Sequence, residues 1–308
     1  MSPAAYRGRL APSPTGYLHL GHARTFWIAA ERAVRHNGVL VLRSEDLDGT
    51  RVRREFANAI IEDLQWLGIR WQEGPDCGGP FAPYLQSERT DWYRQAFETL
   101  REAGLIYSCS CSRQDVIRSA SAPHGEDDEP IYPGTCRNRS NSSANRVNNA
   151  RVLSWRFRVP DGRAIEFIDG HFGRQRLIAG RDFGDFVIWR QDNVPAYQLA
   201  VVVDDAAMQI TEVVRGADLL RSTARQLLLY EALALSAPSF YHCPLMTDEK
   251  GVRLAKRNDA LSLRTLREGG VKADSLIQDW QNQTSWLTKN SAPQVSSMSS
   301  GPTSRHSS

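Results

Sequence analysis

The sequence predicts an α/β fold: a Rossmann-like parallel sheet with an inserted loop-rich module and a small helical C-terminal part. Residues 6–11 (YRGRLA) predict a short strand, a Pro/Gly turn follows, and apolar positions from Leu20 onward are spaced for a helix that Gly38 ends. Residues 39–46 (VLVLRSED) predict a buried strand with acidic residues at its carboxyl end. Together they form a βαβ unit, and open α/β sheets bind ligands beyond the carboxyl ends of their strands.

The later elements follow in chain order. Helical spacing over 53–67 and 88–104, the second closing with Gly104, predicts two surface helices that cover a sheet. The pattern breaks between about 106 and 160, where clustered cysteines, an acidic run and an Asn/Ser/Arg-rich tract indicate an inserted module. Strand-like segments return at 152–159, 163–168 and 183–190, followed by an apolar run at 196–205, a strand, turn and helix onset at 209–220, and an apolar helix over 219–235.

These patterns divide the chain into five parts. They are the first half of the Rossmann-like domain (1–105), the inserted module (106–160), the second half of that domain (161–240), a loop with a helical end (241–286) and a Ser-rich tail (287–308). The tail has no periodicity, so we expect it to be disordered.

Composition narrows the class of protein. The chain has 308 residues, of which 41% are hydrophobic and 24% charged, as in ordinary globular proteins. No run approaches the ~18 apolar residues of a membrane span, and no charged-then-apolar leader opens the chain. We therefore expect a cytoplasmic protein with no membrane contact. The net charge of +3 does not by itself demand a nucleic-acid partner.

Two histidines, His19 and His22, flank a glycine where the first helix begins, in the stretch HLGH. A helix N-terminus presents unpaired backbone N–H groups and a partial positive charge, so it stabilises a phosphate. Gly21 would let a flat ligand lie against the backbone, and imidazoles aimed at a phosphate stabilise charge that develops during displacement. An isolated HxxH is more often incidental, but here the pair follows the turn APSPTG.

The stretch RLAPSPTGYLHLGHAR, from Arg9, resembles the HIGH signature of class I aminoacyl-tRNA synthetases, and their glutamyl branch in particular. That family has a second nucleotide motif, KMSKS, whose counterpart here is RLAKR, with Arg253 and Ala255 departing from the pattern and Lys256 in the place of the second lysine. Only four of the 38 basic residues are lysines, so a lysine at this position favours a point charge on phosphate over a merely solvated basic loop. The resemblance implies ATP binding and catalysis by His19, Gly21, His22 and Lys256.

A glutamate pocket needs at least two cationic groups for the two carboxylates and one anion for the ammonium. Arg9, Arg215 and Glu45 supply this set, and arginine binds carboxylates in a bidentate manner. Each residue singly could instead form a structural ion pair. The resemblance implies contacts to L-glutamate from Arg9, Leu10, Ala11, Pro12, Ser13, Glu45, Tyr197 and Arg215.

Three of the five cysteines cluster in sequence, as C-x-C at Cys109 and Cys111 and a third at Cys136. Thiolates favour tetrahedral zinc, which needs a fourth ligand, and His124 is the ordinary choice. The pattern C-x-C…Y-x-x-x-C, however, resembles the zinc module of compact glutamyl relatives, in which the tyrosine, here Tyr132, is the fourth ligand. We therefore expect one structural Zn²⁺ in the inserted module, with free reduced thiols as the alternative.

The compact relatives are the glutamyl-queuosine tRNA(Asp) synthetases. The resemblance covers roughly residues 6–270, and no large helical anticodon-binding domain follows. It implies a monomer that activates L-glutamate with ATP and Mg²⁺ without tRNA, then transfers the glutamyl group to the queuosine base in the anticodon loop of tRNA(Asp).

Two alternatives stay open. One is a truncated glutamyl-tRNA synthetase that charges the 3′ end of tRNA(Glu). The other is a non-catalytic RNA-binding paralogue, which the altered KMSKS-like loop makes conceivable. Six arginines and no acid between 137 and 158 suit RNA phosphates, although the same tract suits a flexible loop.

Overall fold

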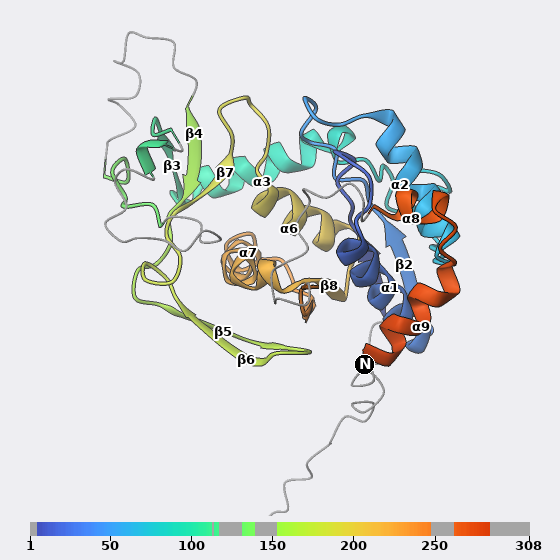
Figure 1. Ribbon diagram of the computed structural model, residues 1–308. Helices are drawn as coiled ribbons and strands as arrows, with labels where there is room; N and C mark the ends of the chain where they lie inside the picture. Colours follow the sequence, from blue (N-terminus) through green and yellow to red (C-terminus); the bar gives the residue numbers. More distant parts are fainter. Residues whose placement is uncertain (1–4, 113, 117–130, 139–152, 248–261, 284–308) are drawn as a thin grey trace, which may run out of the picture.

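The computed structural model describes residues 5–112, 114–116, 131–138, 153–247 and 262–283 (Figure 1). Strand β1 (Arg7–Leu10) pairs in parallel with β2 (Val39–Leu42), and helix α1 (Leu20–Arg35) connects them. This confirms the predicted βαβ unit. Its helix ends three residues before Gly38, where a Cβ would lie 2.5 Å from the Tyr6 ring.

A second sheet has the order β6-β5-β9-β8. Its strands are β5 (Ala164–Asp169), β6 (Gly173–Ile178), β8 (Glu212–Gly216) and β9 (Ser239–Cys243). The backbone N–H of Thr211 donates to the carbonyl of Arg7 at 2.9 Å, which places β8 beside β1. Strands β5, β9 and β8 are parallel, but β6 is antiparallel at the edge, so the expected parallel sheet is in fact mixed.

The third sheet, of order β3-β4-β7, is antiparallel and lies at one end of the molecule, opposite α2, α8 and α9 (Figure 1). Its strands are β3 (Ile106–Cys109), β4 (Ser154–Phe157) and β7 (Phe186–Trp189). Strand β7 comes from beyond the expected module boundary at residue 160 and pairs with β4. Strand pairing depends on long-range packing, which local patterning does not encode.

The structure confirms the predicted helices and shows that the apolar run at 196–205 is also helical. The bounds are α2 (Arg54–Trp66), η1 (Gln86–Glu88), α3 (Thr90–Glu102), α6 (Tyr197–Ala207), η2 (Ala217–Leu219), α7 (Leu220–Ala232), α8 (Leu263–Glu268) and α9 (Ala273–Gln283). The apolar run at 196–205 forms α6, which is buried continuously from Leu199 to Asp205 and is therefore a core helix. Gly104 closes α3 with φ +69°.

A buried ion cluster joins α6 to the first βαβ unit and to α3. Asp204, with no exposed surface, accepts hydrogen bonds from Arg89 Nε at 2.6 Å, Gln86 Nε2 at 2.7 Å and the hydroxyl of Tyr93 at 2.9 Å. Arg43 Nε lies 3.7 Å from the same carboxylate. The carboxylate thus fixes α6 against both β2 and α3.

The neighbouring carboxylate, Asp205, completes the cluster. It accepts from Arg43 Nη1 at 2.7 Å and lies 3.5 Å from Arg9 Nε. Since Arg9 belongs to β1 and Arg43 follows β2, the two carboxylates of one helix hold both strands.

The described residues contain no helix that is both long and apolar enough to cross a membrane. The tail 287–308 lies outside the described residues.

Changing Asp204 to asparagine should lower the free energy of unfolding by about 3–5 kcal/mol, because the buried arginines lose their counter-charge. The matched control is Glu231→Gln, which breaks the exposed pair with Arg163 and should cost about 0–1 kcal/mol. Urea denaturation at pH 7 measures both variants. Similar losses would contradict a special role for the cluster.

Asp63 of α2 should make stability depend on pH. Burial raises its pKa to about 6, against the opposing charges of Arg267 and Arg264, and neither carboxylate oxygen accepts a hydrogen bond in the described part of the chain. The folded protein therefore favours the protonated form of Asp63. Above pH 6 the ionised carboxylate lowers the free energy of unfolding, and this loss disappears as the pH falls toward 4.

Asp63→Asn should accordingly raise the free energy of unfolding at pH 7 by about 1–3 kcal/mol, with a smaller gain at pH 4.5. Paired urea titrations at the two pH values check this. A gain that is the same at both would refute the assignment to Asp63.

Candidate functional site

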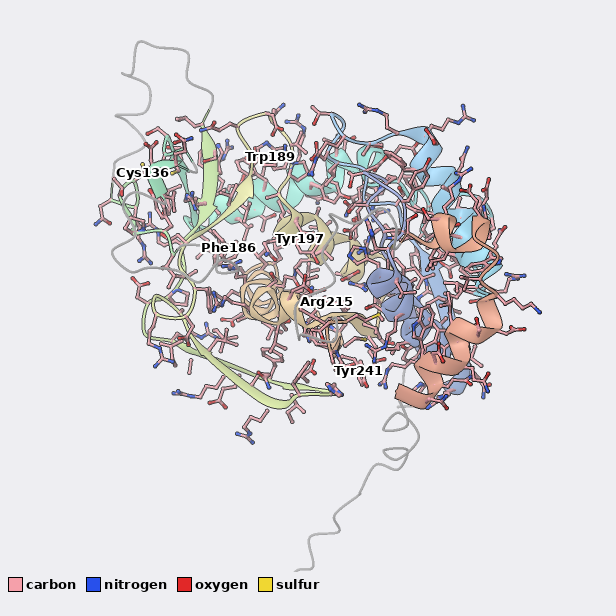
Figure 2. The ribbon with its side chains drawn as sticks, in the orientation of Figure 1. Cys136, Phe186, Trp189, Tyr197, Arg215 and Tyr241 are labelled. Atoms are coloured by element: carbon pink, nitrogen blue, oxygen red, sulfur yellow. The ribbon has the colours of Figure 1, made fainter. Side chains whose placement is uncertain are left out.

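The proposed amino-acid residues gather at the carboxyl edge of the parallel strands. Arg9 and Arg215 lie in the last residues of β1 and β8, and Glu45 follows β2. Tyr197 begins α6 and lies next to Arg215 near the middle of the molecule (Figure 2). Folding thus brings together residues that are far apart in the sequence, at the edge where open α/β sheets bind ligands.

The segment 9–13 lies beside residues 43–45, which follow β2. The backbone N–H of Arg43 donates to the carbonyl of Leu10 at 2.8 Å, and that of Glu45 to the carbonyl of Pro12 at 2.9 Å. Ala11 is half-buried, and Ser13 is exposed. This pairing explains why the RLAPS segment and Glu45 lie side by side.

Arg9 and Glu45 carry opposite charges at this edge of the strands. Arg9 is 4% exposed, and its Nη1 donates to the carbonyl of Val214 at 2.9 Å. Glu45 accepts from Arg43 Nη2 at 3.3 Å. Burial raises the pKa of Glu45, while the charges of Arg43 and Arg9 oppose that rise. The carboxylate is therefore shielded from water but faces cations.

Arg215 differs from the buried arginines of the cluster around α6, Arg43 and Arg89, because its partners are all neutral groups. It is 4% exposed, and its nitrogens donate to His242 Nε2 at 3.1 Å, Gln226 Oε1 at 2.8 Å and Thr223 Oγ1 at 2.8 Å. The hydroxyl of Tyr197 lies 3.4 Å from Nη1. Within the described ranges no carboxylate forms an ion pair with Arg215. A buried cation without a counter-ion favours an anionic ligand.

Sequence patterning did not identify the residues behind Arg215. His242 Nδ1 lies 2.6 Å from Asp169 Oδ2, and both side chains are inaccessible to solvent. Asp169 comes directly after the predicted strand at 163–168, which could have marked it. His242 lies in a strand that patterning did not predict, so no local signal pointed to it.

The HLGH stretch forms the start of α1. His19 is the residue before the helix, with extended backbone, and its carbonyl accepts from the N–H of Ala23 at 3.0 Å. His19 is half-buried and His22 exposed. No acidic residue lies in the first turn, and a Cβ at Gly21 would meet no atom within 4 Å. The helix start therefore offers open space and positive potential to an anion.

Lys256, with Arg253 and Ala255, lies outside the described residues, which resume at Ser262. Ser262 forms an antiparallel bridge with His19, and the N–H of the next residue donates to the carbonyl of Leu18 at 2.7 Å. On the other side of the gap, the carbonyl of Pro244 accepts from Arg24 of α1 at 3.3 Å. Both described flanks of the KMSKS-like segment thus contact the start of α1.

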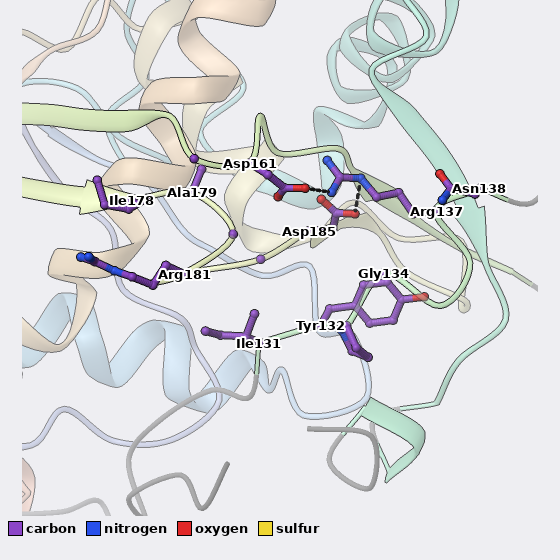
Figure 3. Close-up of a pocket in the computed structure, with 14 residues that line it drawn as sticks. Ile131, Tyr132, Gly134, Arg137, Asn138, Asp161, Ile178, Ala179, Arg181 and Asp185 are labelled. Atoms are coloured by element: carbon purple, nitrogen blue, oxygen red, sulfur yellow. Dashed lines mark hydrogen bonds and ion pairs between the residues drawn. The ribbon is translucent and has the colours of Figure 1, made fainter. Parts of the chain in front are cut away.

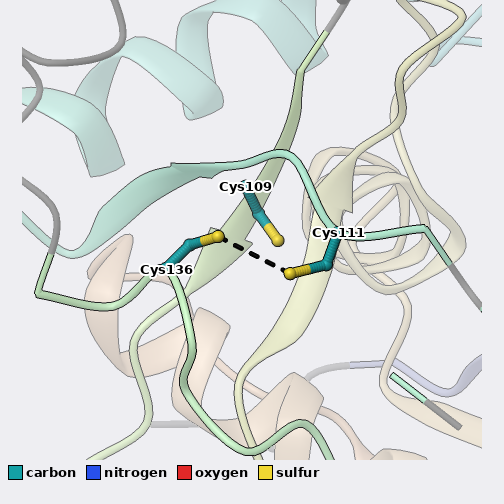
Figure 4. Close-up of side chains that lie close together, drawn as sticks. All are labelled: Cys109, Cys111 and Cys136. Atoms are coloured by element: carbon teal, nitrogen blue, oxygen red, sulfur yellow. Dashed lines mark hydrogen bonds between the residues drawn. The ribbon is translucent and has the colours of Figure 1, made fainter. Parts of the chain in front are cut away.

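The three clustered cysteines meet in space. The Sγ atoms of Cys109, Cys111 and Cys136 lie within 4.8 Å of one another (Figure 4). The hydroxyl of Tyr132 lies 3.5 Å from Cys109 Sγ and 3.6 Å from Cys111 Sγ, and it accepts the N–H of Cys136 at 2.8 Å. This set of donors could hold a metal ion. The rival ligand His124 lies outside the described residues.

A cavity of about 560 Å³ lies against Tyr132 and reaches Arg181 (Figure 3). The guanidinium of Arg137 borders it but forms ion pairs with Asp161 and, at 3.4 Å, with Asp185. Because that charge is already compensated, this cavity lacks the unneutralised cation found at Arg215.

The sequence of the chain is similar to that of class I tRNA synthetases. A family model described as class I tRNA synthetases (E and Q), catalytic domain, matches residues 5–280. The chain is 48% identical to the glutamyl-Q tRNA(Asp) synthetase of Nitratidesulfovibrio vulgaris over 274 residues, which cover 88% of this chain and 83% of that protein. It is 49% identical to the protein of the same name from Symbiobacterium thermophilum, covering 88% of this chain and 84% of that one.

Longer relatives match over the same part of this chain. A glutamate–tRNA ligase from a Sulfurihydrogenibium species is 40% identical, over 88% of this chain and 56% of its own length. The crystal structure of a glutamate tRNA ligase from Elizabethkingia meningosepticum in complex with its amino acid superposes with a TM-score of 0.72 and 33% identity, covering 82% of this chain and 52% of that chain. This chain thus spans about half the length of these ligases.

Proposed function

The chain belongs to the class I tRNA synthetases for glutamate and glutamine and is a ligase of that family, and from this premise we propose that it activates L-glutamate with ATP and transfers the glutamyl group to the queuosine base in the anticodon loop of tRNA(Asp). The relatives named glutamyl-Q tRNA(Asp) synthetase are 48–49% identical to it, against 40% for a glutamate–tRNA ligase. The greater similarity to the former supports the queuosine acceptor.

The observation that carries the proposal is the buried guanidinium of Arg215, whose partners in the described part of the chain are all neutral. Arg9 Nη1 donates to the carbonyl of Val214, the residue before Arg215, and Glu45 follows β2 at the same edge of the strands. In this proposal the two arginines bind the two carboxylates of glutamate, and Glu45 binds the ammonium group. The hydroxyl of Tyr197 and the RLAPS segment complete the wall of the pocket. An anionic side chain in the substrate would supply the counter-charge that Arg215 lacks.

ATP would lie at the start of α1. There Gly21 leaves open space, and His19, His22 and Lys256 would stabilise the charge that develops on the phosphates. The glutamate α-carboxylate would attack the α-phosphorus in line, and pyrophosphate would leave. Mg²⁺, when bound, would supply positive charge to the phosphates. The product, glutamyl-adenylate, is a mixed anhydride, so a hydroxyl of the queuosine cyclopentenediol can displace AMP once it is positioned.

A second candidate is charging of the 3′ end of tRNA(Glu). The similarity to glutamate–tRNA ligases, including the superposition at TM-score 0.72, favours it. The two functions differ in the acceptor and not in the activation step.

The first test is glutamate-dependent ATP–pyrophosphate exchange without tRNA. We expect exchange in the intact protein, and at least a 100-fold loss of kcat/KM for glutamate in Arg215→Gln, because a buried bidentate contact is removed. Arg163→Gln, at an exposed ion pair, is the control and should retain exchange. Full activity in Arg215→Gln would refute the glutamate pocket.

The acceptor is tested separately with radiolabelled glutamate. Label should enter tRNA(Asp) that carries queuosine and not the same tRNA without it. Transfer to tRNA(Glu) instead would establish the second candidate. Failure of exchange both with and without tRNA, in a folded protein, would leave a non-catalytic RNA-binding role.

We further propose that Cys109, Cys111, Cys136 and Tyr132 hold one structural Zn²⁺, which would tie β3 to the segment 131–138. The donor atoms already lie close together, and thiolates favour tetrahedral zinc. Zinc at this site would stabilise the module rather than take part in the reaction, because Cys136 lies at the end of the molecule away from Arg215 (Figure 2).

Metal analysis of the purified protein should find one zinc per chain. Cys136→Ser should lose it, whereas Cys77→Ser, at an exposed cysteine, should keep it. Tyr132→Phe should weaken zinc retention against a chelator and His124→Ala should not. The reverse result for these last two variants would make His124 the fourth ligand.

A further inference from the structure

Arg215 lacks the direct carboxylate contact that the buried arginines of the cluster around α6 have. Arg43 lies next to Asp204, Asp205 and Glu45, and Arg89 forms an ion pair with Asp204. Arg215 instead reaches a carboxylate only through an intervening imidazole, that of His242.

The hydrogen bonds fix the tautomer of His242. Arginine can only donate, so Nε2 must accept from Arg215 Nε at 3.1 Å. A neutral imidazole has one N–H, which therefore sits on Nδ1 and donates to Asp169 at 2.6 Å. The pKa of His242 is lowered, and burial is the largest cause. The charges of Arg215 and Arg9 lower it further, and Asp169 opposes them. A neutral ring is thus favoured near pH 7.

Asp169 is itself held in one orientation. Its Oδ1 accepts the backbone N–H groups of His171 at 3.0 Å and Phe172 at 2.8 Å. Its Oδ2 accepts the backbone N–H of His242 at 3.1 Å and faces the ring of the same residue. The carboxylate can therefore select one tautomer of the ring that it faces.

We propose, on the basis of the proposed function, that Asp169 and His242 are positioning residues that orient the Arg215 guanidinium without neutralising it, and so set the preference for glutamate over glutamine. A carboxylate in direct contact with Arg215 would compete with the substrate carboxylate. The neutral Nε2 atom of His242 accepts a hydrogen bond from the guanidinium and so positions it. The negative charge of Asp169 lies on the far side of the imidazole ring, out of direct contact with Arg215. In this proposal Arg215 faces the side chain of the substrate, and its charge is then compensated by the side-chain carboxylate of glutamate but not by the neutral side-chain amide of glutamine.

Asp169→Asn tests this by reversing the tautomer. Two backbone N–H groups, those of residues 171 and 172, face Oδ1, and one, that of His242, faces Oδ2. The amide oxygen would therefore keep the first two, and the NH₂ group would face His242 Nδ1 with loss of the bond from the His242 N–H. The ring would then carry its proton on Nε2, directed at the N–H of Arg215. We expect the KM for glutamate in pyrophosphate exchange to rise about 10- to 100-fold, and the ratio of kcat/KM for glutamate over glutamine to fall. The KM for ATP should change less than about twofold.

The matched control is Asp185→Asn. Asp185 is also buried and also accepts a backbone N–H, that of Val159 at 2.8 Å, but it lies beside the cavity at Tyr132. It should leave the KM for glutamate unchanged. A rescue pair adds a second readout: His242→Gln, whose amide oxygen can accept from Arg215, should retain more glutamate affinity than His242→Ala.

Nitrogen-15 NMR of the histidine rings reports the tautomer independently of activity. The intact protein should show His242 protonated at Nδ1 and Asp169→Asn should show it at Nε2. An unchanged KM for glutamate in folded Asp169→Asn would overturn the proposal, as would equal increases in KM for glutamate and ATP. If Asp169→Asn does not fold, the His242→Gln and His242→Ala pair decides by the same KM measurement. Absence of exchange in the intact protein would instead reject the proposed function while leaving the tautomer result intact.

Discussion

The buried carboxylates of α6 are the constraint on which the rest of the structure depends. Asp204 and Asp205 follow the apolar run Leu199–Val203 of α6. They hold Arg9 of β1, Arg43, which follows β2, and Arg89, which precedes α3. Removing either acid would leave cations in a medium where unpaired charge costs several kcal/mol. The cluster therefore fixes the first βαβ unit against the core helix before any ligand is considered.

The same cluster shapes the chemistry of the site. Arg9 is shared between Asp205 and the pocket, whereas Arg215 receives only neutral acceptors. The proposed glutamate site is consequently close to electrically balanced at Arg9 and cationic at Arg215. A dicarboxylate ligand matches this asymmetry, since it brings the negative charge that the protein withholds from Arg215.

The two ends of the molecule differ in how much apolar core stabilises them. Around α1 and α9 the core is apolar, with Trp27 packed against Trp280 at a ring-centroid distance of 5.9 Å. The module at the other end has a small separate cluster that includes Tyr132 and the three close cysteines. Because this cluster buries little apolar surface, it contributes little to stability, and the proposed metal ion would stabilise the module.

The sequence by itself determined the βαβ unit and the helices over 53–67, 88–104 and 219–235, because periodicity and turn composition are local properties. The resemblance identified Arg9, Glu45 and Arg215, and the fold brings these three to one edge. Only the tertiary structure decided that β6 is antiparallel, that β4 pairs with β7, and that Asp169 and His242 stand behind Arg215. Strand partners and buried polar contacts join residues far apart in the chain, and no local pattern records which neighbour a side chain will meet.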